Sequence, residues 1–173
     1  MEGIQTIIEA LLLASDAPLT LDRICTILPD AERTEIARAL TGLIDEYEQR
    51  RGGFRLEEVA GGYQFRTRPE LGAWVKRLKK GRPVILTAAA LETLAVVAYR
   101  QPVVKAEIDR IRGVDAGGAL KGLLEKKLVR IVGRKDIAGK PIIYGTTRKF
   151  LEVFALKDLS ELPTVRELED LQR

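Results

Sequence analysis

The sequence predicts an α+β fold, mainly helical, that consists of two winged-helix domains in tandem. Three observations lead to this prediction. Apolar residues recur at helical spacing in three successive segments, a pair of short strands follows them, and the same order then begins again in the second half of the chain. In a winged-helix domain, the second and third helices form a helix-turn-helix and the β-hairpin forms the wing.

In the first half, helices are expected over residues 4–15, 21–28 and 33–51. In each segment the apolar residues are spaced three or four apart, which places them on one face of a helix. Thr20 is the expected N-cap of the second helix, because its hydroxyl can accept a hydrogen bond from a backbone N–H of the first turn. Proline or paired glycines end the segments, at Pro18, Pro29 and Gly52-Gly53.

After these helices the apolar residues alternate, which is typical of strands, over Phe54–Val59 and Tyr63–Thr67. The glycine pair Gly61-Gly62 lies between the two segments and predicts a β-hairpin. A fourth helix is expected over residues 69–80, with Pro69 in its first turn. Its apolar face consists of Leu71, Trp74, Val75 and Leu78.

The second half repeats this order after a basic junction over residues 76–83. The expected elements are helices over 87–100, 105–112 and 116–127, strands over 128–132 and 142–146 joined by a wing over 134–141, and a last helix with Phe150, Leu151 and Phe154. We therefore predict an N-terminal domain over residues 1–82, a C-terminal domain over 83–157 and a tail over 158–173, which either frays or docks on a partner.

The residues that end and open the helices recur at matching positions, which supports an internal repeat. Ile24 follows Pro18 by six residues, and Ile108 follows Pro102 by six. After each hairpin the same pair opens a helix, Thr67-Arg68 in the first half and Thr147-Arg148 in the second. Because the two halves agree in the order of their elements, in residue spacing and in the residues that end and open helices, we predict two copies of one structural unit.

Composition argues against a membrane or secreted protein. The chain has 173 residues, of which 46% are hydrophobic and 31% are charged, and its longest apolar run, residues 7–14, is interrupted by Glu9. A membrane span needs about 20 apolar residues. The first residues lack the basic segment of a signal peptide, and one cysteine, Cys25, can form no internal disulfide. We therefore expect a cytoplasmic protein.

A catalytic function is not expected. The chain has no histidine, which excludes a Ser-His-Asp or Cys-His site and removes the commonest zinc ligand. The segment Ala138-Gly139-Lys140-Pro141 comes nearest to a phosphate-binding loop, but it lies between two expected strands, and Pro141 has no backbone N–H to donate. Because the carboxylates form no pair at an apolar cleft either, we expect no enzyme, no cofactor and no metal.

Binding to DNA, as a winged-helix transcriptional regulator, is the alternative function. The net charge of +4 at pH 7 permits contact with nucleic acid. The third helix of the first half argues against groove reading, because it exposes Glu35, Asp45, Glu46 and Glu48, which phosphates would repel. The best basic group lies on the second wing and would make phosphate contacts; it consists of Arg130, Arg134, Lys135 and Lys140.

The second half also contains a long ordered motif. It runs Leu91-Glu92-Thr93-Leu94-Ala95-Val96-Val97-Ala98-Tyr99-Arg100-Gln101-Pro102-Val103, and continues with Ile111-Arg112-Gly113-Val114, Gly139-Lys140-Pro141 and Tyr144-Gly145-Thr146-Thr147. Together with the opening Ile8-Glu9-Ala10-Leu11-Leu12, this motif strongly resembles the segregation and condensation protein B family of bacterial chromosome-segregation factors. The resemblance covers about residues 4–163. Lys140 departs from it slightly, since the family often has arginine there.

The resemblance implies two winged-helix domains without catalysis. It implies a homodimer, formed chiefly through the first domain, that binds the middle region of a kleisin, segregation and condensation protein A. It further implies that this kleisin bridges the heads of an SMC ATPase, in a nucleoid-associated complex that compacts and separates replicated chromosomes. Any direct contact with DNA would then be weak and nonspecific.

We expect the kleisin to dock on the second domain, where polar residues lie within an apolar frame. Tyrosine and arginine are frequent interface anchors. The expected kleisin contacts are Tyr99, which is equally plausible in the core, Arg100, Gln101, Arg112 and Arg134. The expected dimer contacts in the first domain, equally plausible as core residues, are Leu40, Leu43 and Tyr47.

Overall fold

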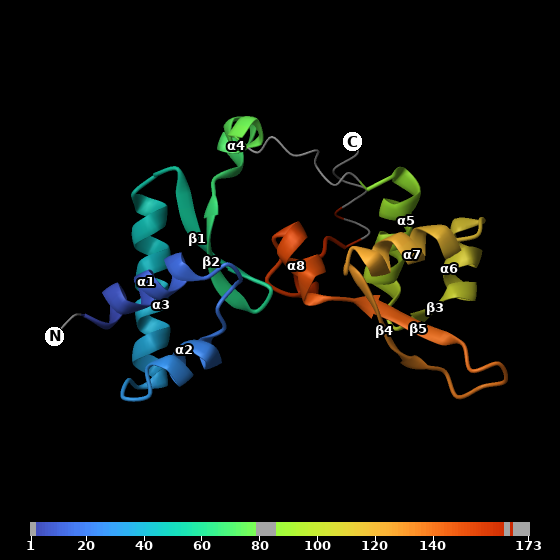
Figure 1. The fold of residues 1–173 in the computed structure, drawn as a ribbon, viewed down its shortest axis with the longest axis horizontal. Coiled ribbons are helices and arrows are strands. Elements are labelled where there is room, and N and C mark those ends of the chain that lie inside the picture. Colours follow the sequence, from blue (N-terminus) through green and yellow to red (C-terminus); the bar gives the residue numbers. More distant parts are fainter. Residues whose placement is uncertain (1–2, 79–85, 165–166, 168–173) are drawn as a thin grey trace. The chain divides into compact units, whose positions relative to one another are not determined.

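The computed structural model describes residues 3–78, 86–164 and 167, and the chain divides into two compact units. Unit 1 consists of Met1–Gly81 together with Ala155–Arg173, and unit 2 consists of Arg82–Phe154. In both units helices precede an antiparallel hairpin, so the predicted winged-helix fold is confirmed (Figure 1). The sequence-based division placed residues 155–157 in the second domain, whereas the structure groups them with unit 1.

Unit 1 begins with the helices α1 (Ile4–Ala14), α2 (Leu21–Ile27) and α3 (Arg33–Gln49). The strands β1 (Phe54–Val59) and β2 (Gly62–Thr67) form the hairpin, and the 3₁₀ turn η1 (Pro69–Leu71) leads into α4 (Gly72–Leu78). The expected N-cap is present, because the Thr20 hydroxyl accepts a hydrogen bond from the Arg23 backbone N–H at 3.2 Å.

The core of unit 1 forms where the apolar stripes of its first three helices meet the hairpin. Its buried members are Ile8, Leu12, Ile24, Ile36, Ala39, Leu40, Leu43, Tyr47 and Leu56. Burying each of the larger aliphatic side chains stabilises the fold by about 1.5–3 kcal/mol. The ring of Tyr47 lies 4.7 Å from that of Phe65 and 5.3 Å from that of Phe54, so aromatic contacts join α3 to both strands.

A two-residue turn connects β1 to β2. Ala60 and Gly61 have positive φ angles of 51° and 67°, as a tight hairpin of this kind requires. The backbones of Leu19 and Tyr63 exchange hydrogen bonds of 2.9 and 2.8 Å, so Leu19 acts as a very short third strand beside β2. A Cβ at Gly62 would lie 2.9 Å from the Leu19 carbonyl, which explains the glycine at this position.

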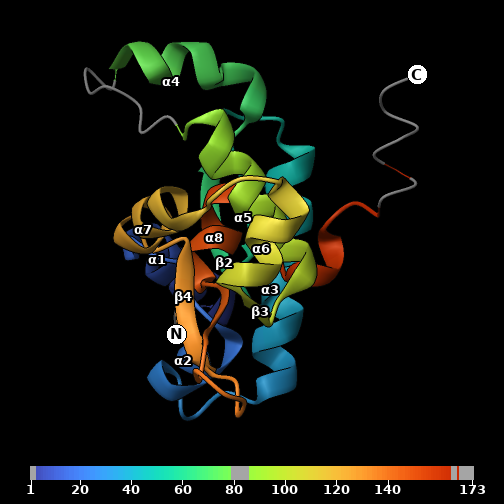
Figure 2. The same cartoon turned by 90° about the vertical axis from the view of Figure 1, so that its right-hand side faces the viewer.

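Unit 2 contains the helices α5 (Ala88–Arg100), α6 (Lys105–Arg112), α7 (Gly117–Glu125) and α8 (Arg148–Phe154). Its strands are β3 (Val103–Val104), β4 (Val129–Arg134) and β5 (Ile142–Thr146), in the antiparallel order β3-β5-β4. In both views the end of the β4–β5 hairpin extends away from α5, α6 and α7 (Figures 1 and 2). This hairpin is the predicted second wing.

The two units repeat one plan. Val103 pairs with Tyr144 of β5 in unit 2, as Leu19 pairs with Tyr63 of β2 in unit 1. A helical turn follows each hairpin, and in unit 2 the Thr147 hydroxyl caps it by accepting a hydrogen bond from the Phe150 N–H at 3.1 Å. The internal repeat, predicted from the matching prolines and Thr-Arg pairs, is therefore present in the backbone.

The segment after α8 contacts the hairpin turn of unit 1. The N–H groups of Ala60 and Gly61 donate hydrogen bonds of 2.8 and 3.0 Å to the carbonyls of Leu156 and Lys157. The Lys157 ammonium also lies 2.9 Å from the Glu58 carboxylate. The 3₁₀ turn η2 (Leu159–Glu161) follows, and residues 165, 166 and 168–173 of the predicted tail lie outside the described residues.

One lysine holds the loop between α6 and α7 of unit 2. Lys105 Nζ lies 2.6 Å from Asp109 Oδ2 and also pairs with the Asp115 carboxylate. Asp109 Oδ1 accepts a hydrogen bond of 2.8 Å from the Ala116 N–H, which fixes the start of α7. The hydrogen bonds from Lys105 lower the pKa of both aspartates, and the same bonds raise the pKa of Lys105.

Acidification is expected to destabilise unit 2 through these aspartates. Because their folded-state pKa values lie below the ordinary value of 3.8, their contribution is present above that pH and is lost as the pH falls through the folded-state pKa. Urea unfolding between about pH 5 and about pH 2 measures the loss. Lys105→Met should flatten this dependence, whereas Lys121→Met, on α7, should preserve it. An equal pH dependence in both variants would contradict the assignment.

A methyl group at Gly62 should destabilise unit 1, because it meets the backbone of residue 19 at a distance that real contacts do not adopt. We expect Gly62→Ala to lower the free energy of unfolding by about 1–3 kcal/mol in urea denaturation. Gly118→Ala is the matched control, since its Cβ meets no atom within 4 Å and lies in α7. That variant should be neutral or stabilised by up to about 1 kcal/mol.

Candidate protein-binding surfaces

The helices α5 and α6 of unit 2 expose large apolar side chains on adjoining faces. Leu91 and Tyr99 on α5 are 46% and 43% exposed, and Ile111 on α6 and Val114 just after it are 49% and 56% exposed. We call these four residues, together with the Glu92–Arg112 ion pair, the α5–α6 face. The interior beneath these helices is filled by Leu94, Val97 and Ile108.

An ion pair joins the two helices within this face. Arg112 Nη2 lies 3.0 Å from Glu92 Oε2, and the Arg112 side chain is only 6% exposed whereas that of Glu92 is 66% exposed. Among the described residues, Arg112 Nε is a buried donor without a hydrogen-bond partner. Arg112 therefore lies beneath the surface and positions Glu92, which presents the charge to solvent.

Gln101, another expected kleisin contact, is half-buried, and its side-chain amide is hydrogen-bonded within unit 2. Its amide oxygen accepts a hydrogen bond of 2.8 Å from the Thr146 N–H, and its amide nitrogen donates to the Thr146 hydroxyl at 3.0 Å and to the Ala98 carbonyl at 3.2 Å. All these partners lie within unit 2. Gln101 thus ties the end of α5 to β5.

The expected kleisin contacts are therefore distributed over separate places. Tyr99 and Arg112 belong to the α5–α6 face, and Arg100 is exposed at the end of α5. Arg134 lies on the wing, where its guanidinium donates a hydrogen bond of 3.1 Å to the Lys140 carbonyl. Arg134 thus lies on a different element, β4, from the other expected contacts.

Of the two alternatives expected for Leu40, Leu43 and Tyr47, dimer contact or core, the structure shows the core. Leu40, Leu43 and Tyr47 are 0%, 1% and 5% exposed, and they pack in the core beneath α1 and the hairpin. The Tyr47 hydroxyl donates a hydrogen bond to the Glu9 carboxylate, which raises the Tyr47 pKa. A second copy cannot contact these side chains while unit 1 stays folded.

Several exposed apolar residues of unit 1 lie on α4 and on the 3₁₀ turn η1 before it. Leu71, Trp74 and Leu78 are 37%, 65% and 82% exposed, and no described residue of α4 is buried. The sequence predicted that these three residues share one face with Val75. It did not predict that this face is exposed to solvent. Residues 79 and 80 of the predicted helix lie outside the described residues.

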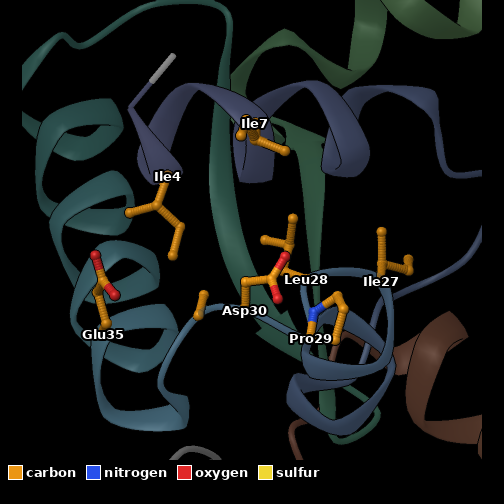
Figure 3. A pocket seen from close by; sticks show the side chains of 8 residues that line it. Ile4, Ile7, Ile27, Leu28, Pro29, Asp30 and Glu35 are labelled. Carbon is orange, nitrogen blue, oxygen red and sulfur yellow. The ribbon is translucent and has the colours of Figure 1, made fainter. Parts of the chain in front are cut away.

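A second apolar surface of unit 1 is a groove of about 430 Å³ between α1, the end of α2 and the loop before α3 (Figure 3). Ile4 and Ile7 of α1 face Ile27, Leu28 and Pro29 across it, as the close view shows. Ala31, Asp30 and Glu35 complete its lining. Sequence periodicity could not reveal this groove, because α1, α2, the loop after α2 and α3 all supply residues to it.

The basic residues of the second wing are partly engaged within unit 2. Arg130 Nε donates a hydrogen bond of 3.2 Å to the Thr146 carbonyl, and Lys135 Nζ lies 2.9 Å from Glu107. The Lys135 ammonium lowers the pKa of that glutamate. Lys140 has a positive φ of 38° at the wing turn. Internal pairing reduces the charge that the wing offers to phosphates.

Two further properties concern the described part of the chain. Within it, no group of three or more histidine, cysteine or carboxylate side chains is arranged to hold a metal ion. None of its helices combines the length and the apolar character needed to cross a bilayer.

Two winged-helix units with exposed apolar residues on their helices define a tandem winged-helix protein. The chain belongs to the family of the segregation and condensation complex subunit ScpB, because the family model matches residues 6–165. The resemblance recognised from the sequence motifs is therefore confirmed.

Two curated relatives agree with this assignment. A segregation and condensation protein B from Syntrophotalea carbinolica is 51% identical over 170 residues, covering 98% of this chain and 86% of that protein. Another, from Myxococcus xanthus, is 49% identical over 98% of this chain, which spans 51% of that longer protein. One solved structure is that of a dimer of ScpB N-terminal domain complexed with ScpA peptide. It is 28% identical to this chain, with a TM-score of 0.39, and the match covers 43% of this chain and 91% of that chain.

Removing the Gln101 side chain should destabilise unit 2. Gln101→Ala leaves the Thr146 N–H and hydroxyl without their partners, which should cost about 1–3 kcal/mol in the free energy of unfolding. The neighbouring variant Arg100→Ala should change it by less than about 0.5 kcal/mol. Thermal and urea unfolding monitored by circular dichroism distinguish the two. Equal stabilities would show that Gln101 is not a structural residue.

Proposed function

We propose that this chain is a non-enzymatic subunit of a bacterial SMC–kleisin complex that acts in chromosome condensation and segregation. Two copies pair through unit 1, and unit 2 binds the kleisin, segregation and condensation protein A. Through the kleisin, the chain associates with the SMC ATPase at the nucleoid, in the cytoplasm. Membership of the ScpB family supports the role in segregation and condensation.

The single observation that carries the kleisin proposal is the α5–α6 face. It presents four large apolar side chains, including one tyrosine, around a fixed Glu92–Arg112 pair. Aromatic and aliphatic anchors around an oriented charge are the chemistry of a protein-binding site rather than of a phosphate-binding one. The matching partner segment has apolar side chains and a cation that meets the exposed Glu92 carboxylate.

The homodimer proposal requires surface residues on unit 1. Leu40, Leu43 and Tyr47 are excluded as contacts because they lie in the core. The apolar face of α4 and the groove beside α1 are the exposed apolar surfaces of this unit that are suited to a second copy. Burial of such surfaces is the main driving force for association of folded domains.

Binding to the kleisin should depend on the α5–α6 face. We expect Tyr99→Ala and Ile111→Ala each to weaken binding of the middle segment of the kleisin by about tenfold or more, because each removes a large apolar anchor. Isothermal titration calorimetry with the purified kleisin segment measures the affinity. Lys121→Ala, on the exposed side of α7, is the control and should bind as the unchanged chain does.

Two results would count against this proposal. If the unchanged chain forms no complex with its kleisin at micromolar concentration, the function is wrong. If the chain binds but both variants keep full affinity, with unchanged circular dichroism, the kleisin binds elsewhere on the molecule.

A second candidate function, contact with DNA, is favoured by the exposed basic residues of the wing, Arg130, Arg134, Lys135 and Lys140. Because three of these residues make internal contacts, we expect weak binding that does not depend on DNA sequence. Fluorescence anisotropy with random duplexes at two salt concentrations checks this. Tight binding to one specific duplex, with a steep dependence on salt, would instead support a transcriptional regulator.

A further inference from the structure

Unit 2 contains an apolar pocket that belongs neither to the α5–α6 face nor to the wing. Its volume is about 380 Å³, and its lining combines apolar side chains with two lysines: Leu86, Leu128, Val153, Lys126 and Lys149. Leu128 is buried, whereas Val153 is 52% exposed, so the apolar lining reaches the surface. We call these five residues the α7–α8 pocket, because one lysine lies at the end of α7 and the other in the first turn of α8.

Hydrogen bonds hold together the two segments that carry these lysines. The Thr147 hydroxyl donates a hydrogen bond of 2.6 Å to the Lys127 carbonyl, and the Thr147 N–H donates to the Leu128 carbonyl at 3.2 Å. The same hydroxyl accepts a hydrogen bond from the Phe150 N–H at 3.1 Å. Because the backbone fixes both segments, the pocket is formed before a ligand arrives, which lowers the cost of binding.

The surface around the pocket is basic. The exposed cations on the segments that frame it are Lys126, Lys127, Arg130, Arg148 and Lys149. Carboxylates interrupt this surface, since Glu125 is exposed at the end of α7 and Glu152 lies 3.3 Å from the Lys149 ammonium. A continuous row of phosphates would meet these carboxylates, whereas a peptide can place single carboxylates beside the cations. An apolar pocket between two lysines also has no counterpart on the outside of a duplex.

The backbone of Lys127 gives an independent indication. At the end of α7, the Leu128 N–H donates a hydrogen bond of 3.0 Å to the Leu123 carbonyl, as in a Schellman motif. Lys127 is the residue of this motif that takes a positive φ, here 57°. Glycine is usual at this place, because a side chain disfavours the conformation. A lysine in this strained position indicates a role for its ammonium at the surface.

We propose that the α7–α8 pocket binds an acidic segment of a partner protein, in which one large apolar side chain lies between carboxylates. The apolar side chain packs against Leu128 and Val153, and the carboxylates pair with the two lysines of the pocket. Lys127 adds a cation beside them. This chemistry is opposite to that of the α5–α6 face, where the exposed Glu92 carboxylate attracts a cation, so the two surfaces select different segments.

Binding of a synthetic peptide tests this inference. The probe is a short fluorescein-labelled peptide with one phenylalanine between flanking glutamates, titrated with the full chain and followed by fluorescence anisotropy. We expect saturable binding. Replacing the phenylalanine by alanine removes the apolar anchor, and replacing the glutamates by glutamines removes the ion pairs. Each change in the peptide should weaken binding at least about tenfold.

Substitutions in the chain locate the site. K126E/K149E should weaken peptide binding by about tenfold or more, and Val153→Asp should do the same because it places a negative charge in the apolar wall. K76E/K121E makes the same change of charge at exposed residues outside the pocket and should bind as the unchanged chain does. Circular dichroism verifies that each variant is folded.

Lys127→Gly separates binding from folding. Glycine relieves the positive φ, so the midpoint of thermal unfolding should rise. Loss of the ammonium should at the same time weaken peptide binding about threefold. A residue that only supported the fold would not give these opposite changes. A stabilised variant with weakened binding therefore supports the inference, and a stabilised variant with full peptide affinity counts against it.

The remaining outcomes separate this inference from the proposed function. Absence of saturable binding at millimolar peptide, or equal binding of the phenylalanine and alanine peptides, would overturn the α7–α8 pocket as a binding site. If random duplex DNA displaces the labelled peptide more effectively than unlabelled peptide does, the surface binds phosphates and the inference is wrong.

The kleisin segment provides the last comparison. Displacement of the peptide by the kleisin segment would overturn the α7–α8 pocket as a separate surface and leave the proposed function intact. Peptide binding that persists while the kleisin segment is bound would support it. Peptide binding by a chain that binds no kleisin would also support it, while contradicting the proposed function.

Discussion

Each unit has room for one small core, and this limit governs the rest of the structure. A domain of this size buries only the inner stripe of each helix and one face of its hairpin. In unit 1 the stripes of α1, α2 and α3 fill that space, and in unit 2 those of α5, α6 and α7 do. Any apolar residue outside the stripe remains in water, which is why Trp74, Leu78 and Ile111 are exposed.

The polar residues of unit 2 serve a second structural purpose. Gln101 joins α5 to β5, Lys105 holds the loop between α6 and α7, and Arg112 braces α5 against α6. These groups are satisfied largely inside the unit, as partly buried polar groups must be. On the α5–α6 face, unit 2 therefore offers a partner mainly apolar side chains, with Glu92 as an oriented charge. This division favours recognition of a protein segment over recognition of phosphates.

The proposals assign different tasks to different surfaces. The α5–α6 face belongs to unit 2 and is proposed to bind the kleisin, whereas α4 and the groove belong to unit 1 and are proposed to pair two copies. Because the residues of these surfaces do not overlap, substitutions can weaken one activity and leave the other. Two separable binding activities suit the role of an assembly subunit.

The sequence by itself determined the order of helices and strands, the hairpins and the repeat, since these depend on local spacing and on turn residues such as Thr20, Pro18 and Gly61. It also determined the family through long motifs. Exposure was decided only by the tertiary structure. Periodicity identifies an apolar face but not what covers it, so Leu40 and Trp74 look alike in sequence.

Long-range contacts decided the candidate sites for the same reason. Gln101 became structural because Thr146 meets it from a strand far along the chain, and the groove exists because α1, α2 and the loop before α3 converge. Neither arrangement is encoded in neighbouring residues. The sequence thus specified the two units and their family, while packing between distant elements decided which side chains remain available to partners.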